Sequence, residues 1–278
     1  MRLGDRDITL VEGPAGWGEC SPFPGCPCDP AMAMRAAEEA ARDGFPEPVR
    51  RDVAVNALVD DATFDPTTLA GYAAVKVKMR APEDLDVVAR VRNAVGPDVA
   101  VRVDANGAWD LDTALALLAP LARLGVELLE QPVTTLEDLA RIRRRSPLPI
   151  AADECVRGVD DARRLRALDA ADVIVLKVQP LGGVRAALRV AEEAGVPAIP
   201  TSMMETSVGL ATGLALACAL PALPFACGLA TAAMLAADVT TEPLVPRGGT
   251  LTRRVVVPDA ALLARYEVAA PSSQVFSS

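Results

Sequence analysis

The chain has 278 residues, of which 51% are hydrophobic and 23% charged, and its formal net charge is −9. This length and composition suit one large α/β domain, or one such domain with a small appendage, and the acidic balance argues against nucleic acid as a partner. The sequence contains no histidine, which excludes Ser-His-Asp and Cys-His catalysis, so any acid–base chemistry near neutral pH must use lysine, a carboxylate, tyrosine or cysteine.

The first 51 residues precede the regular part of the sequence and contain the stretch "ECSPFPGCPC", with Cys20, Cys26 and Cys28. Three thiols at irregular spacing, with no histidine to complete a set, do not predict a zinc centre. Six cysteines in a chain of this size without a secretory pattern are typical of free thiols. No basic segment followed by an apolar run and a cleavage site opens the sequence, so we expect a cytoplasmic protein.

From residue 52 onward, short β-branched runs alternate with stretches rich in Ala, Leu and Arg, which is the pattern of parallel strands joined by crossover helices. In "DLDTALALLAPLARLG", Asp110 and Asp112 fall in the first helical turn and Gly125 follows the end, as helix termini prefer. Eight such units predict an α/β fold of the (β/α)₈ TIM-type barrel class. The predicted strands cover residues 52–59, 73–79, 99–104, 126–130, 149–153, 172–177, 196–202 and 223–228.

Residues 206–237 carry no charged side chain, and a run of this length raises the alternative of a membrane span. Pro221 and Pro224 interrupt it. We therefore interpret this stretch as a buried helix followed by a buried strand, and expect no membrane association.

A polar residue ends each of six successive predicted strands, at intervals of 23 to 26 residues. These residues are Lys78, Asp104, Glu130, Asp153, Lys177 and Ser202. The carboxyl ends of barrel strands form one rim, and this rim carries the active site in essentially every TIM-barrel enzyme. Each acid alone also suits a helix cap, but three acids flanked by lysines favour a shared site.

Three carboxylates that face one another repel, so they predict a hard cation between them. Oxygen donors without imidazole or thiolate favour Mg²⁺ or Mn²⁺ over Zn²⁺. A divalent ion with open positions can hold a substrate carboxylate and stabilise the enediolate that forms when the adjacent carbon loses its proton.

The stretch "AAVKVKMR", residues 73–80, places Lys76 and Lys78 on one face of a strand. An edge strand with one wet face would give the same pattern. At a barrel rim, burial and the charge of Lys76 are expected to lower the pKa of Lys78 until its amine can act as a base. Lys177, across the rim, is the second candidate acid–base group.

The motifs "VKVK", "VRVDANGAWD", "LLEQPV", "AADE" and "DVIVLKVQPLGG", in this order, resemble the enolase superfamily, and specifically its muconate-lactonising subgroup. The resemblance implies a small α+β N-terminal capping domain, which looks shortened here, over residues 1–51. It implies a catalytic barrel over residues 52–240, and a segment over residues 241–278 that returns to the cap and ends in a mobile tail. "GWGECSPFPG" corresponds to a loop that seals the site.

The same resemblance assigns roles by motif. It implies Asp104, Glu130 and Asp153 as Mg²⁺ ligands, and Lys78 and Lys177 as the acid–base lysines. The supporting groups that it implies are Lys76, Asn106 and Glu154.

Within the subgroup, "PTSMMETSVGL" and "PFACGLATAAMLAADVT" look most like members that dehydrate 2-succinyl-6-hydroxy-2,4-cyclohexadiene-1-carboxylate to an aromatic product in menaquinone biosynthesis. This implies a lyase with a small carboxylate substrate. The candidate substrate contacts are Ser202, Thr206, Ser207 and Gly228, although loop and helix-cap roles also suit the first three.

Two alternatives stay open. An N-succinylamino acid racemase or a dipeptide epimerase needs the same two lysines and metal. The stretch "GLATAA" lacks the Asp-x-Asp that dipeptide epimerases usually carry there, which argues against a cationic substrate. The shortened cap raises the other alternative, an impaired or non-catalytic family member, because water reaching the enediolate would reduce turnover.

Overall fold

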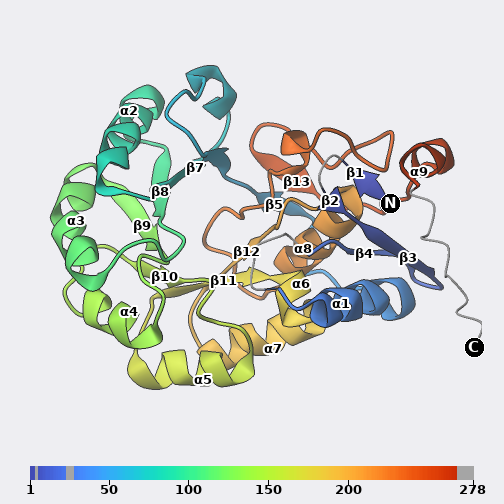
Figure 1. Cartoon of the computed structure of the whole chain (residues 1–278), viewed down its shortest axis with the longest axis horizontal. Coiled ribbons are helices and arrows are strands. Elements are labelled where there is room, and N and C mark those ends of the chain that lie inside the picture. The colour runs from blue at the N-terminus through green and yellow to red at the C-terminus, as the bar shows by residue number, and fades with distance from the viewer. Residues whose placement is uncertain (4–5, 23–27, 268–278) are drawn as a thin grey trace, which may run out of the picture.

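The computed structural model describes residues 1–3, 6–22 and 28–267. Its centre is a parallel sheet of seven strands that follow one another in chain order and curl around a common interior (Figure 1). The strands are β6 (Ala57–Val59), β7 (Ala74–Lys78), β8 (Ala100–Asp104), β9 (Val126–Glu130), β10 (Ile150–Ala152), β11 (Val173–Lys177) and β12 (Ala198–Thr201). The predicted α/β barrel class is confirmed.

The eighth position of the barrel is filled by two residues, so the predicted strand over 223–228 is wrong. Cys227 forms a parallel bridge with Val55, and Gly228 forms one with Thr201. Backbone hydrogen bonds from Cys227 N to Ala54 O (2.8 Å) and from Gly228 N to Pro200 O (3.0 Å) tie this segment to both edges of the sheet. Proline at position 224 has no N–H to donate and disfavours regular pairing around it, which explains why only the end of the apolar run is bonded.

The predicted strand over 52–59 divides in two. β5 (Asp52–Ala54) pairs antiparallel with β13 (Thr250–Thr252), outside the barrel, whereas β6 pairs with β7. The change of partner falls at Val55 and Asn56, whose N–H groups donate to Gly249 O and Cys227 O. A continuous β-branched run predicts extended backbone, but does not show where the backbone changes its pairing partner.

Helices pack around the outside of the sheet (Figure 1). Val75 and Val77 of β7 belong to the apolar layer under these helices, together with Val88 of α2, whereas Lys76 and Lys78 face the barrel mouth. Asp110 caps α3 by accepting a hydrogen bond from Thr113 N. The helices are α2 (Leu85–Val95), α3 (Leu111–Arg123), α4 (Leu136–Arg143), α5 (Val159–Leu168), α6 (Val178–Leu181), α7 (Val184–Ala194) and α8 (Ser207–Ala219), with 3₁₀ turns η1 (Pro66–Leu69), η2 (Pro82–Asp84) and η3 (Ala232–Met234).

A small N-terminal domain lies beside the β11–β12 side of the barrel (Figure 1). It consists of β1 (Arg2–Leu3), β2 (Arg6–Asp7), the hairpin β3 (Thr9–Gly13) and β4 (Gly16–Cys20), and helix α1 (Pro30–Asp43). Helix α1 packs so closely on β4 that a Cβ at Gly18 would lie 1.9 Å from the carbonyl oxygen of Ala37. This contact therefore requires glycine.

The C-terminal segment returns towards the N-terminal domain. After β13, helix α9 (Ala260–Tyr266) contributes Leu263 and Tyr266 to an apolar cluster that also contacts Leu10 and Trp17. The tail predicted over the last residues, and Cys26 with part of "GWGECSPFPG", lie outside the described residues. Cys20 and Cys28 are buried free thiols.

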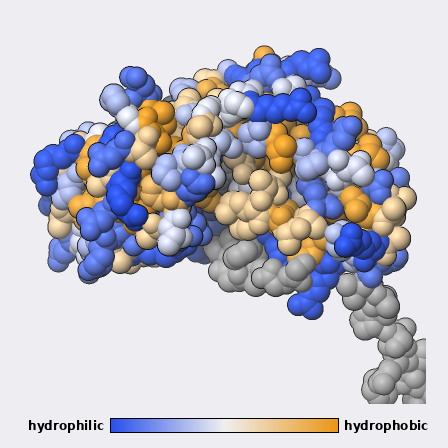
Figure 2. All heavy atoms as spheres, turned by 90° about the horizontal axis from the view of Figure 1, so that it is seen from above, coloured by the Kyte–Doolittle hydropathy of each residue, from blue (hydrophilic) through white to orange (hydrophobic). Residues whose placement is uncertain are grey.

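The apolar run that begins at residue 206 forms helix α8, which is buried on nearly every side. No helix in the described part of the chain has the length and apolar character needed to cross a bilayer. On the face shown in Figure 2, hydrophilic and hydrophobic side chains are interspersed.

Candidate active site

The predicted rim residues converge on one cavity of about 160 Å³ at the carboxyl end of the barrel. Lys78, Asp104 and Glu130 are register neighbours on β7, β8 and β9. Asp153 directly follows β10, and Lys177 ends β11. The predicted residues that line the cavity are Lys76, Lys78, Asp104, Asp153, Lys177, Ser202 and Gly228.

On one side of the mouth, two lysines share Asp104. The ammonium of Lys78 donates to Asp104 Oδ2 (2.7 Å) and to Asn106 Oδ1 (2.7 Å). Lys76 Nζ lies 3.0 Å from Asp104 Oδ2 and 3.0 Å from Glu130 Oε1. Glu130 therefore sits behind Lys76 rather than in the wall of the cavity.

On the opposite side, Lys177 Nζ donates to Asp153 Oδ2 (2.5 Å) and to Glu154 Oε1 (3.2 Å). Asn106 links the two sides, because its amide nitrogen Nδ2 donates to Glu154 Oε1 (3.2 Å). Asn106 has a φ of 48°, in the left-handed region that asparagine tolerates better than most residues. Of the supporting groups suggested by the motifs, Asn106 contacts Lys78 and Glu154 contacts Lys177, whereas Lys76 shares Asp104 with Lys78.

Burial and the neighbouring charges determine the pKa values of the three carboxylates. Burial, reinforced by Asp104, raises the pKa of Glu130 to about 8 despite the opposing charge of Lys76. Burial likewise raises the pKa of Asp153 to about 6, against the opposing effect of Lys177. For Asp104, Lys76 and Lys78 together outweigh burial and lower its pKa.

Contacts with carboxylates determine the charge of Lys76 and Lys177. Burial disfavours the ammonium of Lys177, but Asp153 and Glu154 outweigh it and raise the pKa. For Lys76, Asp104 and Glu130 likewise outweigh burial and raise the pKa. Lys76 and Lys177 are therefore held as cations, since each contacts two carboxylates.

The donor set fits a hard divalent cation, although no three His, Cys, Asp or Glu side chains in the described ranges form a ready-made ligand group. Lysine ammonium groups contact the oxygens of Asp104, Glu130 and Asp153. These three carboxylates are almost fully buried on neighbouring strand ends. Burial and mutual repulsion destabilise their charged forms, and a cation with oxygen preference would relieve both.

Two of the predicted substrate contacts lie elsewhere. Thr206 and Ser207 are fully buried at the start of α8. Ser207 Oγ donates to Asp238 Oδ2 (2.6 Å), and Thr206 Oγ1 donates to Glu19 Oε2. The structure therefore does not bring this pair into the wall of the cavity, because both hydroxyls are used at the beginning of the helix.

The cavity also contains residues that the sequence reasoning missed, namely Asn56, Leu58, Asp60, Thr201, Met204, Ala230, Thr231 and Met234. Asn56 is a single polar residue within an apolar strand run, which is a signal that could have identified it. Ser202 Oγ lies 2.7 Å from Thr231 Oγ1. Met204 has a φ of 61°, which no sequence pattern indicates.

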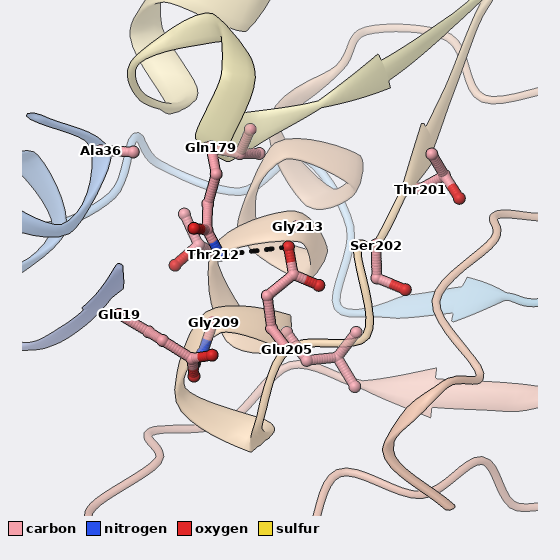
Figure 3. Close-up of a pocket in the computed structure, with 11 residues that line it drawn as sticks. Glu19, Ala36, Gln179, Thr201, Ser202, Glu205, Gly209, Thr212 and Gly213 are labelled. Carbon is pink, nitrogen blue, oxygen red and sulfur yellow. Dashed lines mark hydrogen bonds between the residues drawn. The ribbon is translucent and has the colours of Figure 1, made fainter. Parts of the chain in front are cut away.

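Next to the active site lies a small polar cavity between β4, α6, β12 and α8 (Figure 3). Glu19 and Glu205 are both buried there. Glu19 accepts hydrogen bonds from Thr206 N (3.1 Å) and Gly209 N (2.9 Å), so the N-terminal domain caps helix α8. Burial, and then the charge of Glu19, raise the pKa of Glu205 to about 7.

This raised pKa predicts a pH-dependent contribution of Glu205 to stability. The folded protein binds the proton more tightly than the unfolded chain, so the free energy of unfolding should increase as pH falls from about 7 to about 4.5, by at most about 1.4 kcal/mol per pH unit. Glu205→Gln should lack this contribution and gain stability relative to the wild type as pH rises through that window. Urea unfolding at several pH values measures the difference, and parallel curves for the two proteins would contradict it.

Two family models match the chain, "Enolase C-terminal domain-like" over residues 57–261 and "Enolase N-terminal domain-like" over residues 3–41. The chain therefore belongs to the enolase superfamily. Among its curated relatives, the o-succinylbenzoate synthase of Thermobifida fusca (strain YX) is 50% identical over 95% of this chain and 86% of that protein. The o-succinylbenzoate synthase of Mycolicibacterium smegmatis is 43% identical over 97% of this chain and 86% of that protein.

Solved structures agree with this placement. A muconate lactonizing enzyme from Pseudomonas fluorescens, complexed with muconolactone, is 28% identical and superposes with a TM-score of 0.77 over 85% of this chain and 73% of that chain. A muconate cycloisomerase from the same species, 24% identical over 96% of this chain and 95% of that chain, superposes with a TM-score of 0.83 and supports the fold alone.

Proposed function

We propose that this protein is an o-succinylbenzoate synthase, a carbon–oxygen lyase that dehydrates 2-succinyl-6-hydroxy-2,4-cyclohexadiene-1-carboxylate to o-succinylbenzoate in menaquinone biosynthesis. The observation that carries the proposal is the pair of lysines on opposite sides of one cavity, with three buried acids between them. The two synthases to which the chain is similar over nearly its whole length support the same reaction.

The contacts of the two lysines suggest different roles. Lys177 is held by two carboxylates, Asp153 and Glu154, and is suited to remain an ammonium that stabilises the developing negative charge. Lys78 contacts one carboxylate, which it shares with Lys76, and the neutral amide of Asn106. It is therefore the better candidate for the base.

In this assignment, Lys78 Nζ takes the proton from the carbon next to the substrate carboxylate. The electron pair moves into the ring as the carbon–oxygen bond to the hydroxyl breaks, and the Lys78 ammonium returns its proton to that oxygen, which leaves as water. Mg²⁺, held by Asp104, Glu130 and Asp153, would supply positive charge that binds the substrate carboxylate and offsets the charge developing beside it. Mn²⁺ has the same ligand preference.

Racemisation of N-succinylamino acids is the second candidate, because lysines on both sides of the cavity would allow a proton to leave from one face and return to the other. A cationic dipeptide fits less well. Asp60 lines the cavity but pairs with Arg80 at 2.6 Å, so its charge is already compensated. We place the protein, as part of this proposal, in the cytoplasm.

Incubation of the purified protein with the cyclohexadiene substrate and Mg²⁺ should produce the ultraviolet absorbance of the aromatic product. N-succinylamino acids and dipeptides serve as the competing substrates. Their racemisation or epimerisation is measured by the change in optical rotation. Efficient racemisation without dehydration would transfer the assignment to the second candidate. A folded protein with neither activity would favour an impaired family member.

A further inference from the structure

Arg6, on strand β2 of the N-terminal domain, is only 5% exposed although it lies near the start of the chain. Its Nη1 donates to the carbonyl oxygens of Met203 (2.7 Å) and Met204 (2.8 Å), and its Nη2 donates to the carbonyl oxygen of Ser21 (2.5 Å). One guanidinium thus joins two distant segments: the start of the segment after β4 and the loop between β12 and α8. Charged hydrogen bonds of this kind, when buried, are costly to lose.

The two carbonyls on the β12–α8 side flank one residue. Met203 O precedes the Met204 Cα and Met204 O follows it, so the same nitrogen of Arg6 fixes the peptide groups on both sides. Met204 has a φ of 61°, and a side chain other than glycine persists in this region only where its surroundings impose the conformation. The carboxylate of Glu205 adds to the constraint by accepting from Met203 N at 2.6 Å.

Met204 is part of the active-site wall. It lines the same cavity as Lys78 and Lys177. The backbone conformation that Arg6 imposes therefore determines where this side chain enters the substrate space.

Ser21, which accepts a hydrogen bond from Arg6, is in turn bonded to Gln179 on the other side of the site. Ser21 N donates to Gln179 Oε1 (2.9 Å), and Gln179 Nε2 donates to Ser21 Oγ (3.2 Å) and Glu205 Oε1 (3.3 Å). Gln179 follows Lys177 by two residues, and Figure 3 shows its amide directed at Glu205. The N-terminal domain is thus bonded to the cavity wall at Met204 and to the turn after the catalytic strand β11.

We propose that Arg6 is a positioning residue that sets substrate affinity: by bonding the peptides around Met204 and the carbonyl of Ser21, it builds the pocket wall only when the N-terminal domain is docked on the barrel. The expected change in KM rests on the proposed function. These hydrogen bonds of Arg6 go to backbone carbonyl oxygens and not to Lys78 or Lys177, so its loss should impair binding more than the chemical steps.

The test compares Arg6→Ala, Arg6→Lys and the wild type. Arg6→Ala should raise KM by about 10- to 100-fold while kcat changes by less than about threefold. Arg6→Lys should recover only part of the loss, because an ammonium cannot match the planar fork. Guanidinium chloride at millimolar concentration should lower the KM of Arg6→Ala, whereas potassium chloride at the same concentration should not. Arg2→Ala, at an exposed arginine with one weak ion pair at 4.0 Å to Asp7, is the matched control and should behave as the wild type.

A second readout does not depend on turnover. With methyl-labelled methionine, the Met204 resonance should move in Arg6→Ala and return towards its wild-type position on addition of guanidinium. If the wild type fails to dehydrate the substrate while this shift and its recovery are seen, the proposed reaction is wrong and the positioning role stands. An unchanged Met204 resonance, an unchanged KM, or a loss of kcat that guanidinium does not recover would overturn the role of Arg6.

Discussion

Replacing Lys78 with alanine should lower kcat for dehydration by at least about 10³-fold, because general acid–base catalysis contributes about 10²- to 10⁴-fold and Lys78 is assigned both proton transfers. The fold should survive. Lys78 shares Asp104 with Lys76, so the buried carboxylate keeps a cation at 3.0 Å after the substitution. Steady-state kinetics and thermal unfolding of the same preparation measure the two effects.

Lys78→Arg separates proton transfer from charge. Arginine can keep the ion pair with Asp104 but cannot be deprotonated in proteins, so this variant should be as inactive as Lys78→Ala and closer to the wild type in stability. Arg90→Ala, at an exposed position on helix α2 outside the lining of the cavity, controls for the loss of one cation. If Lys78→Ala kept kcat within about tenfold of the wild type, Lys78 would not be the base.

The rim of the active site was predictable because barrel geometry turns sequence spacing into proximity. One strand and one helix separate each rim residue from the next, and parallel register then places Lys78, Asp104 and Glu130 side by side. The alternation within "VKVK" also predicts that both lysines face away from Val75 and Val77, which pack under the helices.

Features that depend on distant partners were not predictable in this way. The stretch over 223–228 is apolar and β-prone, but Pro224 has no N–H to donate, and the pairing with the two edges of the sheet is confined to Cys227 and Gly228. Thr206 and Ser207 carry hydroxyls near the rim, and only the fold shows that Glu19 and Asp238 use them. Such contacts join residues that no local pattern connects.

The pairing of the charged side chains at the rim was likewise not predictable from the sequence. The spacing indicated that three acids and three lysines would meet, but not which amine would be bound by two carboxylates. In the structure this is true of Lys76 and Lys177, and these ion pairs raise the pKa of both amines. The ion pairs favour a division of labour between Lys177 and Lys78.

Removal of divalent cations with EDTA should abolish dehydration, by at least about 10³-fold, and added Mg²⁺ should restore it. The physical reason is the cost of three buried carboxylates on adjacent strand ends. Burial and Asp104 raise the pKa of Glu130 to about 8. The charged form of this carboxylate is therefore unfavourable, and a nearby divalent cation would stabilise it strongly. The dependence of rate and of the unfolding temperature on Mg²⁺ concentration gives the apparent affinity.

Glu130→Gln tests the ligand assignment directly. An amide keeps the size of the side chain but removes its charge, so the Mg²⁺ midpoint should rise by at least about tenfold, both in the rate and in the unfolding temperature. Glu12→Gln removes one charge from an exposed position on β3 and should leave both midpoints unchanged. Equal midpoints for Glu130→Gln and the wild type would remove Glu130 from the metal site, and full activity in metal-free protein, checked by elemental analysis, would remove the metal from the reaction. Binding measured through stability remains informative even where the variant is inactive, because an ion that contacts Asp104 and Asp153 stabilises the folded chain whether or not the substrate turns over.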